Sequence, residues 1–199
     1  MRDMTNEELD NVAYLEGSDF SKQRTQEVYD MGTNSDRNVA WQKCTTGNLD
    51  SDDKGSGARK SAGKAQLDLI PIRYWLGAWD FYLVSEERTF MQELASWQER
   101  HTSAYELMGL FSYKELAGAA KVLAFGAKKY KAWNWAKGMP WSVPTGCILR
   151  HMQAIVDDEL LDAESGEEHW MHVVCNVMML AWYEVHYSEG DDRPPVFRT

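Results

Sequence analysis

Apolar residues recur every three or four positions in three segments that follow residue 112, and this spacing limits the possible folds most strongly. A period of three to four residues places apolar side chains on one face of a helix. We therefore predict helices over about 112–129, from Ser142 to about Leu161, and over about 168–187. Ser142 and Pro144 would form the cap and first turn of the second helix.

The rest of the chain shows no convincing strand pair, Gly-rich phosphate loop or internal repeat, which favours an all-α fold, a helical bundle. Short helices are expected around 6–15 and 22–31, a polar linker or loop at 48–64, and a helix opened by Pro71. The domain boundaries that follow are a weakly ordered N-terminal arm at 1–62, the bundle at 63–190 with an aromatic-rich segment at 72–111, and a tail at 191–199.

Composition excludes several classes of protein. Nine Trp residues in 199 are far more than a disordered chain carries. The net charge of −10 argues against binding to duplex DNA, and no apolar run is long enough to span a bilayer. The first 20 residues are acidic, so we expect no signal peptide, and three widely spaced Cys fit a reducing cytosol. A cytoplasmic protein without DNA or membrane partners is expected.

The charges are divided sharply along the chain. Seven basic residues and one acid lie between Lys114 and Arg150, whereas eleven acids and no Lys or Arg lie between Asp157 and Asp192. Such a division suits a metal–polyphosphate ligand, because lysines can hold phosphates while carboxylates hold divalent cations. It also suits two solvated helix faces that attract each other, and charge alone favours this second interpretation.

Three of the five His residues, His151, His169 and His172, lie within 22 positions of one another. The acids between them include Asp157, Asp158, Glu159, Asp162 and Glu164. On a continuous helix, positions 151, 155, 158 or 159, and 162 would share one face, and on the next helix His169, His172 and Asn176 would align. Two such helices joined by a short turn could build a cation site in a bundle. Oxygen ligands favour Mg²⁺ or Mn²⁺, and His favours Mn²⁺ or a softer ion.

The same residues also fit a purely structural role. Ser165 and Glu168 have the spacing of a capping box, and His residues beside Trp170 can pack at a boundary. Spacing alone leaves both interpretations open. Cys147 and Cys175 are expected to pack rather than react, because neither belongs to a C-x-x-C motif.

A cluster of Trp133, Trp135 and Trp141 follows Lys128 and Lys129. These rings could stack on a nucleobase while the lysines hold phosphates, or they could fill the core, which is the commoner fate of Trp. The sequence leaves both alternatives open.

Four segments occur in a distinctive order: GKAQLDLIP at 63–71, VLAFGAKKYKAWNWAKGMPWS at 122–142, the pair Arg150–His151, and ELLDAESGEEHWMHVVCN at 159–176. In this combination the chain resembles the phage-encoded dATP/dGTP diphosphohydrolase N-terminal-domain family, a group of MazG-like nucleotide pyrophosphohydrolases that includes the MazZ type. The resemblance implies an all-α bundle, a divalent metal, and hydrolysis of dGTP or dATP to the monophosphate and pyrophosphate. It further implies phage nucleotide metabolism, in which dGMP can supply 2-aminoadenine synthesis, and a homo-oligomer.

With this resemblance, roles can be assigned as expectations. Catalytic roles would fall to Glu159, Asp162, Arg150 and Lys128. Substrate would be bound by Lys64, Lys129, Tyr130, Trp133, Asn134, Trp135, Lys137 and Asn176. Metal (Mg²⁺ or Mn²⁺) would be held by Asp158, Glu159, Asp162, Glu164, His169 and His172.

Two departures from the family pattern stand out. Fifty residues (Ile72–Lys121) separate the LDLIP segment from the VLAFGAKKY segment, and His169 and His172 stand where MazG relatives carry acids. Alternatives to the enzyme are a phage protein that binds and sequesters a nucleotide without cleaving it, and an interaction protein that docks a host partner through its aromatic segment. A phosphohydrolase of the HD type is disfavoured, because the chain lacks an adjacent His-Asp pair.

Overall fold

The computed structural model describes residues 45–60 and 64–197, and this part of the chain is almost entirely helical. The prediction of an all-α fold is therefore confirmed, while the helices expected around 6–15 and 22–31 lie outside the described residues. No helix in the described part is long and apolar enough to cross a membrane. The six α-helices are α4 (Ile72–Trp79), α5 (Ser85–Gln98), α6 (Ala104–Met108), α7 (Tyr113–Tyr130), α8 (Ser142–Val156) and α9 (His169–His186).

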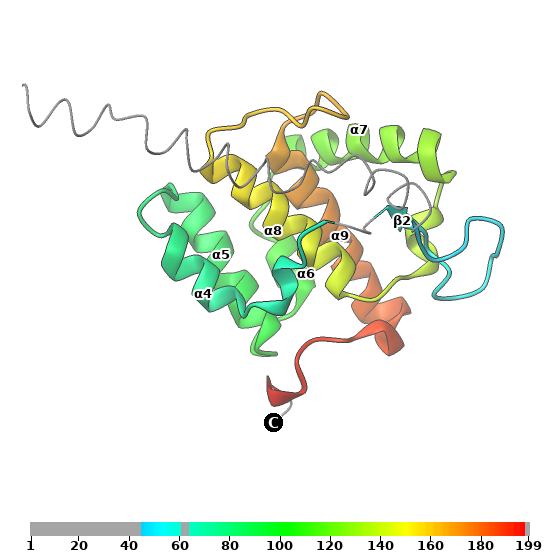
Figure 1. Cartoon of the computed structure of the whole chain (residues 1–199), viewed down its shortest axis with the longest axis horizontal. Helices are drawn as coiled ribbons and strands as arrows, with labels where there is room; N and C mark the ends of the chain where they lie inside the picture. The colour runs from blue at the N-terminus through cyan, green and yellow to red at the C-terminus, as the bar shows by residue number, and fades with distance from the viewer. Residues whose placement is uncertain (1–44, 61–63, 198–199) are drawn as a thin grey trace, which may run out of the picture. The chain divides into compact units, whose positions relative to one another are not determined.

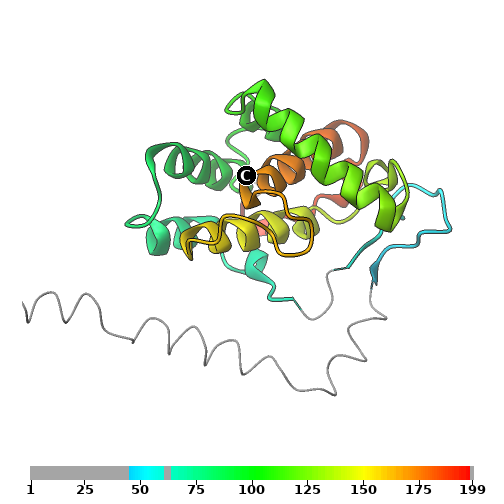
Figure 2. The ribbon, with the colours of Figure 1, turned by 90° about the horizontal axis from the view of Figure 1, so that it is seen from above.

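Helix α9 forms the centre of the bundle, with α8 and α7 packed against it (Figures 1 and 2). A helix in this position is apolar around most of its circumference. Accordingly, α9 fully buries Val173, Val174, Val177, Leu180 and Tyr183. The prediction of a last helix over about 168–187 is confirmed to within one residue at each end.

The aromatic-rich segment at 72–111 forms helices α4, α5 and α6 and contributes to the same core. As expected, Pro71 directly precedes the first of these helices. The side-chain oxygen Oε1 of buried Gln98 accepts a 2.8 Å hydrogen bond from the backbone N–H of Ile72, which ties the start of α4 to the end of α5. Core residues from this segment are Ile72, Phe90, Met91, Leu94, Trp97 and Leu107.

Helix α7 begins at a capping box and lies close to α9. Ser112 Oγ accepts a hydrogen bond from the N–H of Glu115, and the Glu115 carboxylate accepts one from the N–H of Ser112. A β-carbon added to Gly118 would lie 2.2 Å from the sulfur of Met171 on α9, so a larger residue would require the Met171 side chain to shift. The predicted helix over about 112–129 is confirmed.

Helix α8 ends earlier than predicted, at Val156 instead of about Leu161. The N–H of Glu159 donates to the carbonyl of Ala154 and the N–H of Asp158 donates to that of Ile155, which is the Schellman pattern of helix termination. Asp158 adopts the left-handed conformation (φ 60°) that this pattern requires. The prediction that positions 158, 159 and 162 continue the helical face of His151 is therefore wrong. The start is also different: Ser142 is the first helical residue and bonds Asp192 rather than capping the helix.

Residues before the bundle form a small antiparallel ladder between β1 (Thr45–Thr46) and β2 (Arg59–Lys60), joined by an ordered loop. The end of this loop is fastened to the 3₁₀ turn η2 (Asn134–Lys137), which interrupts the Trp-rich loop before α8. The Asn134 side-chain amide donates to the Ala58 carbonyl at 2.8 Å and its carbonyl accepts from the Ala58 N–H at 3.1 Å.

The chain after α9 passes through the 3₁₀ turns η3 (Ser188–Gly190) and η4 (Pro195–Phe197). Between them the guanidinium carbon of Arg193 lies 4.7 Å from the ring centre of Trp97 and 4.8 Å from that of Trp141. The Asp191 carboxylate accepts hydrogen bonds from both Arg193 and Arg100. This network fixes the tail against the core.

Candidate functional site

Three imidazoles meet where α8 approaches its end and α9 begins. His151 lies on α8, and His169 and His172 lie on one face of the first turn of α9 because they are three residues apart. The Nδ1 atoms of His151 and His169 are 2.8 Å apart, and the rings of His151 and His172 stack with centres separated by 4.4 Å. His169 and His172 are both buried. The structure therefore brings together the three residues that the sequence places within 22 positions.

The loop between the two helices adds a carboxylate to this group. The turn predicted at 162–168 is confirmed: the N–H of Asp162 donates to the carbonyl of Glu167, and Leu161 forms a β-bridge with Glu168. Asp162 Oδ1 lies 3.7 Å from His172 Nε2. Single atoms of Asp162, His151 and His169 all lie within 4.8 Å of one another, so these three residues could hold one metal ion.

Ser165 links the carboxylate to the third imidazole. Its hydroxyl donates to Asp162 Oδ1 at 2.8 Å and lies 2.7 Å from His172 Nε2. Because the single hydroxyl proton goes to Asp162, His172 Nε2–H is the donor in the second contact. Ser165 is thus not a helix cap, and Glu168 makes no side-chain capping bond to α9, so the alternative of a capping box at these two residues is wrong.

The surroundings fix the protonation states of the cluster. Burial, assisted by the charges that His172 and His169 would carry, lowers the pKa of His151 to about 2. Burial also lowers the pKa of His172. Burial alone would raise the pKa of Asp162, but hydrogen bonds from Ser165 outweigh it and lower that pKa. Near neutral pH His151 and His172 are therefore neutral and Asp162 is ionised, which are the forms that bind metals.

One buried ring nitrogen has no hydrogen-bond partner among the described residues. It is Nε2 of His169, whose nearest charged neighbour is Glu159 Oε2 at 3.8 Å. For the Nδ1 atoms of His151 and His169 to form a hydrogen bond, one of them must carry a proton. In the tautomer where His169 Nδ1 is the donor, Nε2 of His169 carries no proton and can only accept a hydrogen bond or bind a metal. Leaving such an atom buried and unsatisfied is costly unless a ligand binds it.

The metal ligands expected from the sequence are distributed differently in the structure. Asp162 and His169 belong to the group, Glu159 lies beside it, and His172 is joined to it through Ser165. Glu164 instead forms an ion pair with Lys129, and Asp158 is exposed at the end of α8. His151 was missing from the expected ligand set, although its place six residues before Asp157, where the acidic stretch begins, is a signal that could have included it.

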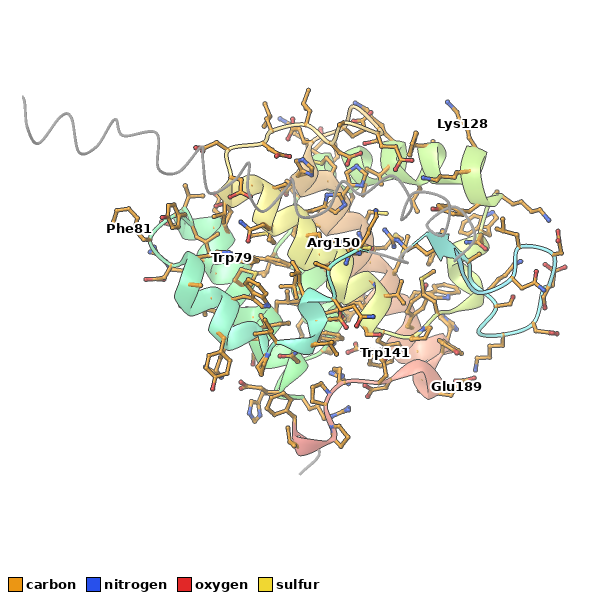
Figure 3. All side chains as sticks on the ribbon, in the orientation of Figure 1. Trp79, Phe81, Lys128, Trp141, Arg150 and Glu189 are labelled. Carbon is orange, nitrogen blue, oxygen red and sulfur yellow. The ribbon has the colours of Figure 1, made fainter. Side chains whose placement is uncertain are left out.

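The expected phosphate-binding cations also separate into two groups. Lys128 lies near the far end of α7 and points away from α8, whereas Arg150 lies near the middle of the molecule on α8 (Figure 3). Lys129 pairs with Glu164, and Lys137 pairs with Asp52. Arg150 instead donates to the Ala65 carbonyl and to the sulfur of Cys147. The structure therefore engages Lys129 and Lys137 with acids outside the histidine cluster, and Arg150 with neutral atoms.

The residues expected to bind the base, Trp133, Asn134 and Trp135, lie in η2 and directly before it. Asn134 is buried, and its amide is fully occupied by Ala58. Trp135 packs against Trp182, while Trp133 is 72% exposed and 6.0 Å from Trp135 between ring centres. Tyr130 ends α7 with Lys129 over its ring at 5.5 Å.

Asn176 lies one helical turn beyond His172, to whose carbonyl it donates. Its side-chain oxygen accepts a 2.7 Å hydrogen bond from Arg59, a residue that the sequence analysis did not select.

The structure is thus a helical bundle in which two successive helices and their connecting loop present imidazoles and a carboxylate, a set of groups that could serve a metal-dependent hydrolase. Comparison with known families agrees with this description: residues 93–193, about half of the chain, match the family dATP/dGTP diphosphohydrolase, N-terminal. The chain belongs to this family. Neither the curated proteins nor the solved structures gave a match. The family's name supports a diphosphohydrolase activity at the level of the family.

Proposed function

We propose that the protein is a metal-dependent pyrophosphohydrolase that converts dGTP, dATP or both to the monophosphate and pyrophosphate. The observation that carries the proposal is the group formed by His151, Asp162 and His169, which could hold one metal ion, in a chain of this family. The likeness of its motifs to those of MazZ-type enzymes supports a place in phage purine deoxynucleotide metabolism, where dGMP would serve synthesis of 2-aminoadenine.

The residues of the group fit a divalent ion. Two imidazole nitrogens and one carboxylate oxygen are a mixed ligand set, which suits Mn²⁺ or a softer ion better than Mg²⁺. His151, Asp162 and His169 would hold the ion, and the unsatisfied Nε2 of His169 would gain a partner. Such an ion, when bound, supplies Lewis-acid activation of water and neutralises phosphate charge.

The chain's own residues would position the substrate and move the proton. Water attacks the α-phosphorus, the bond from this phosphorus to the bridging oxygen breaks, and pyrophosphate leaves. Glu159, an exposed carboxylate 3.8 Å from His169, would accept the proton of the attacking water. Arg150 would balance the charge on the phosphate oxygens, because no carboxylate of the described residues lies within ion-pair distance of it.

The test is to incubate the purified protein with dGTP or dATP and either Mn²⁺ or Mg²⁺, and to separate the products by anion-exchange chromatography. We expect monophosphate and pyrophosphate in equal amounts, a faster reaction with Mn²⁺, and no reaction with EDTA. Asp162→Asn should lower kcat/KM by about 100-fold. Asp80→Asn is the matched control, since Asp80 is a 60% exposed residue that pairs with Arg88 after α4.

Other outcomes would contradict the proposal in distinct ways. Release of triphosphate or of single phosphates would identify a different phosphohydrolase chemistry. Tight binding of dGTP without turnover, unaffected by metal, would favour the alternative of a nucleotide-sequestering protein. An Asp162→Asn variant as active as the Asp80→Asn variant would place the reaction elsewhere in the chain.

A further inference from the structure

Arg59 differs from most arginines of the described residues in having no acidic partner. Four of the others each form an ion pair with a carboxylate: Arg73, Arg88, Arg100 and Arg193. Within the described part of the chain, only Arg59 and Arg150 lack one. This is unexpected in a protein with 31 acidic and 21 basic residues, because acids are available in excess.

The contacts of Arg59 are with neutral atoms only. Its Nη1 donates to Asn176 Oδ1 at 2.7 Å and lies 3.7 Å from the sulfur of Met179. The side chain is half-buried, and Asn176 is completely buried. A cation that has lost part of its water without gaining a counter-charge is unfavourable, which indicates that an anion completes this environment.

The backbone holds Arg59 firmly in this place. The residue before it, Ala58, is 1% exposed and is bound on both its N–H and its carbonyl by the Asn134 side chain. The N–H of Gly57 donates to the Gly138 carbonyl at 2.8 Å, and a β-carbon on Gly57 would lie 2.5 Å from that oxygen. Asn134 therefore acts as the anchor that directs Arg59 toward α9.

Other cations and the histidine cluster lie near the Arg59 guanidinium. Asn176, which accepts a hydrogen bond from Arg59, lies four residues beyond His172 on α9, a rise of about 6 Å. The exposed Lys64 has a lowered pKa through desolvation, and the charges of Arg150 and Arg59 contribute to this lowering. Arg59 thus lies in a region that also holds Lys64 and Arg150, and its partner Asn176 lies close to the start of α9, which carries His169 and His172.

We propose that Arg59 binds the pyrophosphate portion of a triphosphate whose α-phosphorus lies at the histidine cluster. The ligand's identity rests on the proposed function, while the anion site rests on the contacts of Arg59. A guanidinium matches the paired oxygens of a phosphate chain through its planar fork. Arg59 lies before residue 93, where the family match begins, so the segment around β2 completes the site from outside the matched region.

The test is isothermal titration of the metal-free protein with inorganic pyrophosphate, in EDTA, so that no turnover is required. We expect wild-type protein to bind pyrophosphate, and Arg59→Gln to weaken the affinity by about tenfold or more, since a charge-assisted hydrogen bond is lost. Arg59→Lys keeps the charge but lacks the planar fork, so it should recover only part of the affinity. Arg73→Ala is the control, because Arg73 is an exposed arginine that already pairs with Glu99.

A second measurement separates this inference from the proposed function. If dGTP and dATP are cleaved, Arg59→Gln should raise KM more than it lowers kcat. If neither nucleotide is cleaved but pyrophosphate still binds in an Arg59-dependent manner, the proposed function fails and the anion site stands. A folded Arg59→Gln protein, judged by circular dichroism, that binds pyrophosphate as tightly as wild type overturns the inference. Absence of pyrophosphate binding by wild type overturns it as well.

Discussion

Two aspartates show how neighbouring residues decide what one side chain can do. Asp162 accepts hydrogen bonds from the N–H and hydroxyl of Ser165, which are neutral donors, so its charge stays available to a cation. Asp191 accepts from two guanidinium groups, those of Arg100 and Arg193, and its charge is already balanced. The first residue therefore suits a binding site, and the second stabilises the fold.

Asp191→Asn should lower the free energy of unfolding by about 2 kcal/mol near pH 7, because charge-assisted hydrogen bonds are lost. Burial alone would raise the pKa of Asp191, but the hydrogen bonds from Arg193 and Arg100 outweigh it and hold this pKa below its ordinary value. Because the pKa of Asp191 is lowered in the folded state, its charge stabilises the fold at pH values above the unfolded-state pKa of about 3.9. This stabilisation is lost as the pH falls from there through the folded-state pKa.

Urea denaturation at several pH values measures this effect. The difference between wild type and Asp191→Asn should shrink as the pH is lowered from 5 toward 2. The exposed Asp80→Asn change should cost less than about 1 kcal/mol at pH 7. A difference between wild type and Asp191→Asn that is independent of pH would show that the carboxylate charge is not the source of the stability.

At the scale of the element, the end of α8 decides the geometry of the site. Because the helix terminates at Val156, Glu159 and Asp162 are carried by a loop that turns back to α9. On a continuous helix, Asp162 would lie 11 residues beyond His151, about 16 Å along the axis. The left-handed Asp158 thus allows the carboxylate to return to the imidazoles.

Asp158→Gly should stabilise the protein by about 0.5–1 kcal/mol, since glycine adopts the left-handed conformation at a helix end without the cost that a side chain imposes. Asp158→Ala should have the opposite effect, because alanine lacks the local hydrogen bonding that lets aspartate tolerate this conformation. Thermal unfolding followed by circular dichroism compares the three proteins. A lower midpoint for the glycine variant than for the alanine variant would contradict the assignment of this helix end.

The sequence predicts long periodic elements well and their connections less well. Helices α7 and α9 follow from apolar spacing sustained over 18 residues each. The end of α8 could not be predicted, because Asp rather than Gly occupies the left-handed position and the apolar pattern gives no stop signal there. The histidines and Asp162 could be selected because they are close in sequence, whereas Arg59 meets Asn176 across 117 positions.

At the scale of the whole molecule, the core extends well beyond the region that matches the family. Residues before position 93 contribute Ile72, Trp79, Leu83, Phe90 and Met91, all of them at most 4% exposed. These side chains pack with the core residues of the matched region in a single cluster. The matched region by itself therefore lacks the core side chains that α4, the turn after it and the start of α5 contribute.

A fragment of residues 93–199 should not unfold cooperatively, because removing the core residues before position 93 exposes apolar surface that the intact protein buries. Near-ultraviolet circular dichroism and binding of a hydrophobic dye would detect the loss of tertiary packing. The comparison is a fragment of residues 44–199, which retains the whole core and should show a sigmoidal transition. A sigmoidal transition of the shorter fragment at the same temperature would show that α4 and the start of α5 are dispensable.

The contact between Gly118 and Met171 joins α7 to the part of α9 that carries the histidines. Met171 lies between His169 and His172 in the first turn of α9. A methyl group added at Gly118 would require the Met171 side chain to shift. A substitution on α7 would thus change the packing of the turn that carries His169 and His172.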